Sequence, residues 1–149
     1  MYNNEARDLT NFLTIVQKGI RKHGIKKIVR IIQAIDLQES NMFYNEIFSY
    51  ILRLVSDEYN FTADEILQPK TRGDITIARN MAIILIKKHL NISDELLAKE
   101  FDRVRVVVYK VCAEFKEYDR NDKFYKEFFE VYDRLDEKIA KHIEYLKND

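Results

Sequence analysis

Three basic side chains and two valines between positions 103 and 110 have the chemistry to contact a DNA groove. An arginine can pair through two hydrogen bonds with O6 and N7 of guanine, a lysine neutralises phosphate, and a valine methyl can pack on the methyl group of thymine. The candidate base-reading residues are Arg103, Arg105, Val106, Val107 and Lys110.

The composition of this segment leaves its secondary structure ambiguous, whereas the spacing of its apolar residues favours one type. Its valines and tyrosine favour a strand by propensity. Apolar residues at helical intervals predict a helix instead, which would turn Arg103, Val106, Val107 and Lys110 outward. Outward valines also fit a second interpretation, an exposed apolar patch that binds a protein partner. The residues expected on the inner face are Val104, Val108, Val111, Cys112 and Phe115.

The elements that must position this helix precede it directly. A long helix is predicted from Ile75 to His89, a break follows at Asn91 to Ser93, and a short helix is predicted from Asp94 to Phe101. Long helix, short helix, tight turn and helix is the layout of a helix-turn-helix DNA reader, whose last helix lies in the major groove.

A polar loop before the long helix supplies further positive charge. Thr62 and Glu65 form a capping-box pattern that predicts a one-turn helix ending before Pro69. In the loop that follows, Lys70 and Arg72 are candidate contacts to phosphates or a minor groove, although the loop also fits an ordinary solvated turn. Arg79 of the long helix is a third candidate phosphate contact, with a structural ion pair as its alternative.

The remaining sequence predicts further helices and no sheet. Only three Gly and one Pro occur, which leaves few positions for tight turns. Apolar stripes predict helices over about 4–22, from Ile25 to near Asp36, over about 41–59 with Ser40 or Asn41 as cap, and over about 122–146. We expect an all-α fold of about seven helices. The stripe of the last helix is expected to contain Phe124, Phe128, Val131, Leu135 and Ile139.

The net charge of zero conceals an uneven distribution. Residues 66–116 contain 10 Lys and Arg against 6 Asp and Glu, whereas the residues from 117 onward contain more acids than bases. Residues 18–30 carry six Lys and Arg with no acid. This basic run fits either a second nucleic-acid surface or the solvated face of two amphipathic helices.

Catalysis, metals and cofactors have no support in the sequence. His23, His89 and His142 are far apart without metal-ligand spacing, and no Ser-His-Asp or Cys-His arrangement can be proposed. Cys112 is the single cysteine, so no internal disulfide forms. No apolar run approaches about 18 residues. We expect a cytoplasmic protein that is not an enzyme and needs no cofactor or metal.

Four stretches follow the order of motifs in one known domain family. They are a helix with Ile47, Ile51, Val55 and Tyr59, then Ala63 to Leu67, then Ala78 to Leu85 after the basic loop, and Ser93 to Phe101. With this order of motifs, the chain resembles the C-terminal DNA-binding domain of the bacterial replication initiator DnaA over roughly residues 43 to 135. The resemblance implies a Trp-repressor-like helix-turn-helix fold and binding to short duplex sites. It supplies no ATPase, because the sequence lacks a Gly-x-x-x-x-Gly-Lys-Ser/Thr loop.

The recognition motif departs from that of the family. Where the family has Gly-Arg-Asp-His-Thr-Thr-Val, this chain has Asp102-Arg103-Val104-Arg105-Val106-Val107-Val108, after a one-residue deletion. We therefore expect a duplex-DNA-binding protein with altered sequence specificity and a replication or regulatory role. The alternative is a protein interaction module that kept the fold and lost DNA reading.

Three regions follow from these predictions. Residues 1–40 are expected to form a helical pair packed on the core, residues 41–135 the helix-turn-helix domain, and residues 136–149 an extension of the last helix. That extension would pack on the first two helices or dimerise. The expected partners are double-stranded DNA and either a protein partner or a second copy of the chain.

Overall fold

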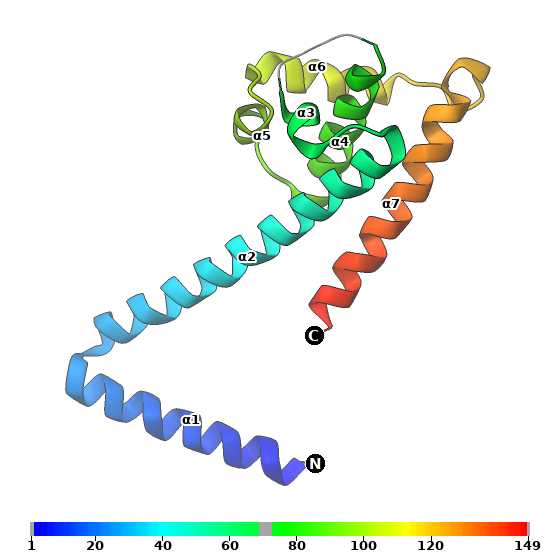
Figure 1. Cartoon of the computed structure of the whole chain (residues 1–149). Helices are drawn as coiled ribbons and strands as arrows, with labels where there is room; N and C mark the ends of the chain where they lie inside the picture. The colour runs from blue at the N-terminus through cyan, green and yellow to red at the C-terminus, as the bar shows by residue number, and fades with distance from the viewer. Residues whose placement is uncertain (1, 69–72, 149) are drawn as a thin grey trace. The chain divides into compact units, whose positions relative to one another are not determined.

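The computed structural model describes residues 2–68 and 73–148, and every regular element in these ranges is helical (Figure 1). Seven α-helices and one 3-10 turn are present there, which confirms the predicted all-α class. The chain divides into two compact units, Met1–Phe43 and Tyr44–Asp149.

The first unit contains α1 (Tyr2–His23) and the beginning of α2 (Ile25–Tyr59). Gly24, at φ +83°, separates the two helices as predicted. The expected stop near Asp36 and the new helix capped by Ser40 or Asn41 are wrong, because α2 continues through both positions. No Gly or Pro lies between Ile25 and Tyr59 to break the helix, and a capping residue needs extended backbone.

In the second unit, the helix after α2 begins as the capping box predicts. Asn60 leaves α2 with φ +58°, and α3 spans Ala63–Leu67. The Thr62 hydroxyl accepts from the Glu65 amide at 3.1 Å, and the Thr62 amide donates to the Glu65 carboxylate at 3.0 Å. Two amides of the first turn are thereby satisfied.

The centre of the second unit is α4 (Asp74–Leu90), which contacts α3, α5, α6 and α7. Its middle is apolar on every side, with each residue from Met81 to Ile86 buried. A helix that is apolar all round is covered on all faces by neighbours, whereas the other helices of the unit bury one stripe each. Their buried contributions include Ile47, Ile51 and Val55 from α2, Ile66 from α3, Leu97 from α5, Val108 from α6, and Leu135 and Ile139 from α7.

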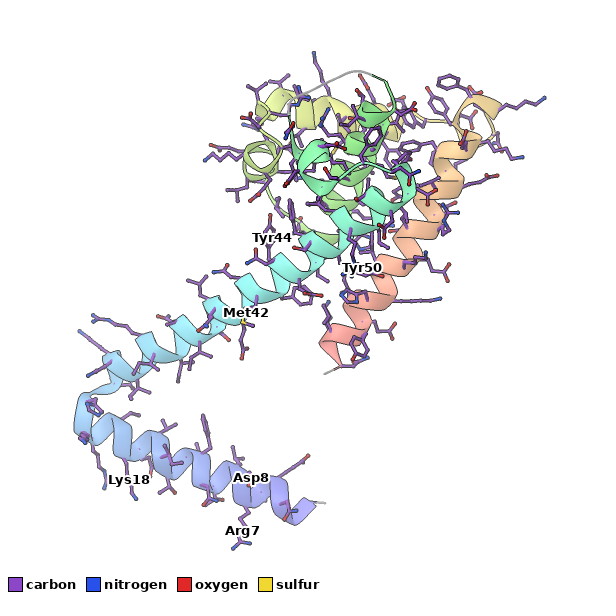
Figure 2. The ribbon with its side chains drawn as sticks, viewed as in Figure 1. Arg7, Asp8, Lys18, Met42, Tyr44 and Tyr50 are labelled. Atoms are coloured by element: carbon purple, nitrogen blue, oxygen red, sulfur yellow. The ribbon has the colours of Figure 1, made fainter. Side chains whose placement is uncertain are left out.

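The last helix, α7 (Lys126–Lys147), follows a 3-10 turn at Lys123–Tyr125. Leu135 and Ile139 are buried as expected, but Phe124 is 82% exposed because it lies in the 3-10 turn, before the helical stripe begins. Near the end of α7, the His142 ring stacks on Tyr50 of α2 with ring centroids 3.9 Å apart. Figure 2 shows Tyr50 on the side of α2 that faces α7.

Candidate nucleic-acid interface

Two consecutive helices pack against α4 and are the candidate DNA-reading helices. The first is α5 (Asp94–Glu100), whose N-cap Ser93 accepts from the Leu96 amide at 3.2 Å. The second is α6 (Arg105–Lys116), which packs against both α5 and α4. The valine-rich segment is therefore helical, as its spacing predicts and against its strand propensity.

The turn between α5 and α6 is closed by backbone hydrogen bonds. Asp102 adopts φ +48°, and its amide donates to Lys99 at 3.2 Å. The Arg103 amide donates to the Ala98 carbonyl at 2.8 Å, which completes a Schellman motif. Asp102 stands where the similar family has Gly, and Asp is among the side chains that best tolerate this left-handed conformation. The turn forms here without a glycine.

Val104 does not take its predicted place on the inner face. It is the N-cap of α6, with φ −85° and ψ 150°, and it is 67% exposed. The helical register begins only at Arg105, so the spacing argument does not extend to Val104. Its side chain offers no acceptor to the free amides of the first turn. Val108, one turn into the helix, is fully buried as predicted.

The exposed face of α6 carries most of the predicted reading residues. Arg105 and Lys110 are exposed, and Val106 is 57% exposed. Arg103 and Val107 are half-buried, at the edge of this face. Tyr109 is 64% exposed between Val106 and Lys110 and was missed in the sequence, where it counted only as strand propensity. Its spacing of four from Arg105 is the signal that places it on the same face.

Arg79 occupies a different position from the one that a phosphate contact requires. It is 3% exposed, and its Nε donates to the Ile66 carbonyl at 2.8 Å. One terminal nitrogen donates to the carbonyls of Gln68 and Glu65. The other, Nη1, is buried without a hydrogen-bond partner among the described residues. Burial and the nearby positive charge of Arg103 lower the pKa of the Arg79 guanidinium.

Arg79 therefore binds the carbonyls at the C-terminal end of α3. The structural pair with an acid, which was the alternative from the sequence, is replaced by a set of backbone acceptors. The other two candidate phosphate contacts, Lys70 and Arg72, lie outside the described residues.

The far end of α4 is attached to α7 by a cluster of charged groups. Asp136 accepts from Lys88 and contacts Nε2 of His89, both at 2.6 Å. Partial burial raises the pKa of the Asp136 carboxyl, but the two hydrogen bonds outweigh this effect and the pKa lies below its usual range. His89 thus combines its expected place at a helix C-terminus with an acidic partner.

A cavity of about 560 Å³ lies between α2, α4 and α7 in the second unit. Aromatic rings and the carboxylates of Glu58, Asp74 and Glu127 line it. Burial and the charges of Glu58 and Glu127 raise the pKa of the Tyr59 hydroxyl to about 12. These negative charges make the cavity unsuitable for phosphate.

No group of three or more side chains among the described residues is arranged to hold a metal ion. Across the same residues, no helix combines the length and the apolar character needed to traverse a lipid bilayer.

The arrangement of α4, α5, the Asp102 turn and α6 defines residues 74–116 as a helix-turn-helix. Residues 48–114 match the family model of the bacterial DnaA protein helix-turn-helix, so this segment is similar to the C-terminal domain of that family. The match is narrower than the expected 43 to 135. It is flanked by α1 and the part of α2 before residue 48 on one side and by α7 on the other. No curated protein is significantly similar to the chain.

Proposed function

We propose that the helix-turn-helix unit binds duplex DNA with α6 in the major groove. The observation that carries this proposal is the exposed face of α6, where Arg105, Val106, Tyr109 and Lys110 project from a domain of a DnaA-type family. Glu114 is the one acid in α6, so little negative charge opposes the approach of phosphates.

The contacts divide by role. Arg105 is proposed to pair with guanine. Val106 and the accessible part of the Val107 side chain are proposed to contact thymine methyl groups. Lys110 and Arg103 are proposed to contact backbone phosphates, together with Lys70 and Arg72 of the basic loop. We leave Arg79 out of this set because its guanidinium is buried against α3.

We infer a sequence preference different from that of DnaA itself. The resemblance assigns polar base contacts to positions that here hold Val104 and Arg105, and it replaces two threonines by Val106 and Val107. Apolar contacts with thymine methyls take the place of hydrogen bonds with base edges. A role in replication or in regulation belongs to the same proposal, and it rests on the family resemblance alone.

The experiment is fluorescence anisotropy with random duplexes at several salt concentrations, followed by selection of preferred sites. Arg105→Ala should weaken binding to a preferred site by about 1–3 kcal/mol and binding to random duplex much less. Lys110→Ala should weaken both about equally and reduce the salt slope by about one unit. Lys138→Ala, an exposed lysine on α7, is the matched control and should change neither.

The exposed apolar side chains of α6 favour one alternative, a protein interaction surface. Val104, Val106 and Tyr109 are 67%, 57% and 64% exposed and lie within two turns of one another. On this alternative, Val106→Ser would abolish binding to a protein partner. Unmodified protein that shows no salt-sensitive duplex binding at micromolar concentration in low salt would exclude the DNA proposal and favour this one.

A further inference from the structure

The first unit exposes far more apolar surface than a soluble helix pair normally does. Its large apolar side chains from Leu9 to Leu37 are between 44% and 69% exposed in the structure. Most of them form an amphipathic stripe on α1 and on the N-terminal part of α2. The members of this N-terminal stripe are Leu9, Phe12, Leu13, Ile25, Val29, Ile31, Ile32 and Ile35, whereas Ile15 and Leu37 are exposed on other faces of their helices.

Packing between α1 and α2 covers only the residues near their turn. A Cβ atom added to Gly19 would lie 3.0 Å from Cδ1 of Ile28, so the two helices approach closely there. Val16, Ile20 and Ile28 are half-buried, whereas Leu9 and Ile35, farther from the turn, are more than half exposed. Within the first unit, packing between the two helices therefore leaves most of the N-terminal stripe uncovered.

The area of the N-terminal stripe corresponds to a stable protein interface. At roughly 100 Å² for each half-exposed side chain, the eight side chains of the stripe offer on the order of 800 Å² per chain, above the patches of about 300–600 Å² found on monomers. A symmetrical pair would bury about 1,600 Å², which is the standard size of a specific protein interface.

The charges beside the N-terminal stripe specify the orientation of a partner. The turn region, residues 18–30, is strongly basic. Acids lie at the opposite ends of both helices, Glu5 and Asp8 in α1 and Asp36 and Glu39 in α2. Arg7, Asp8 and Lys18 are labelled along α1 in Figure 2. Within one α1–α2 helix pair, the basic residues lie together at the turn and the acidic residues lie together at the other end. Two such pairs packed antiparallel would place the basic turn of each pair against the acidic end of the other.

We propose that the N-terminal stripe is the docking surface for a second copy of this chain, with the two helix pairs antiparallel about a twofold axis. A twofold pair is self-complementary, so one surface with a basic end and an acidic end satisfies itself. The seam on α2 has the spacing of a coiled coil, with Ile25, Ile28, Ile32 and Ile35 at intervals of three and four residues. This inference does not rest on DNA binding.

The test is the mass of the full-length chain in solution, measured by sedimentation equilibrium over a range of concentrations. The wild type should be a dimer. Leu13→Glu combined with Ile32→Glu places charges in the N-terminal stripe and should raise the dissociation constant by at least about 100-fold. Asn11→Glu combined with Asn41→Glu adds the same charges at exposed positions away from the stripe and should leave the dimer intact.

Salt and charge reversal test the antiparallel orientation. Raising the salt concentration should weaken the dimer, because unlike charges meet in it. Reversing Glu5 and Asp8 to Lys should weaken the dimer several-fold, and adding Lys18→Glu, Arg21→Glu and Lys22→Glu to the same chain should restore it.

Three results would overturn the proposal. They are a wild-type chain that stays monomeric at tens of micromolar, a stripe variant that still dimerises, and a dimer that strengthens as salt is added. Circular dichroism shows whether a variant has lost its helices. If it has, the wild-type mass and its salt dependence decide the question by themselves.

Discussion

Replacing Arg79 by Met separates a structural arginine from a DNA-binding one. Methionine keeps an unbranched apolar stem of similar reach, so the packing of the side chain in the core is largely preserved. The substitution removes the guanidinium that donates to the carbonyls of Ile66 and Gln68. The carbonyl groups at the C-terminal end of α3 then lose their hydrogen-bond donor.

The expected loss of stability follows from these hydrogen bonds. A hydrogen bond that involves a charged group contributes about 1.5–3 kcal/mol, and a buried carbonyl left without a partner costs about 1–3 kcal/mol. Relief of the repulsion between Arg79 and Arg103 offsets part of this loss. We therefore expect the free energy of unfolding to fall by about 2–4 kcal/mol.

The assay combines urea unfolding with the salt dependence of DNA binding. With an m-value of about 2 kcal/mol/M, the urea midpoint should fall by roughly 1–2 M. The slope of affinity against salt should not change, because a buried guanidinium neutralises no phosphate. Arg105→Met is the matched comparison, since this exposed arginine should lose DNA affinity while the free energy of unfolding stays within about 0.5 kcal/mol.

The opposite pattern would refute the reasoning. If Arg79→Met leaves the urea midpoint unchanged and reduces the salt slope by about one unit, Arg79 contacts a phosphate. The burial of its side chain against α3 would then not describe the DNA-bound protein.

Two further changes test single features of the second unit. Val104→Ser supplies the missing N-cap acceptor of α6 and should stabilise the protein by about 0.5–2 kcal/mol in urea unfolding. A loss of stability would show that Val104 is packed rather than exposed. Asp136→Asn should destabilise the protein by about 1 kcal/mol at pH 7. Because the pKa of Asp136 is lower in the folded state, its contribution is present above the unfolded-state pKa and is lost as pH falls through the folded-state pKa. The difference in unfolding free energy between wild type and variant should therefore close below about pH 4, and a difference that stays constant down to pH 2 would contradict the account.

Local patterns in the sequence were sufficient for the elements of this fold and for their order. Periodic apolar residues predicted the helices, and the capping box at Thr62 and the break at Asn91 to Ser93 marked two helix starts within a residue. These predictions succeeded because they depend on contacts within a few residues of the chain. The same reasoning failed at Asp36 to Asn41, where polar residues with capping potential remain helical.

The exposed face of α6 was predicted only in part. Helical spacing alone gave the outward positions of Val106 and Lys110, but the helix start at Arg105 was needed to place Val104 and Tyr109. The start is set by the Schellman turn at Asp102, whose backbone hydrogen bonds are not visible in the spacing of apolar residues.

The sequence by itself determined that this chain is helical, that a helix-turn-helix follows α4, and that basic residues gather in and before it. Only the tertiary structure decided which of those basic residues face solvent. Arg79 and Arg105 are both arginines in basic surroundings, yet α3 lies over the first and nothing among the described residues covers the second. Burial depends on which distant segment packs against a side chain, and that choice is made by the whole core rather than by neighbouring residues.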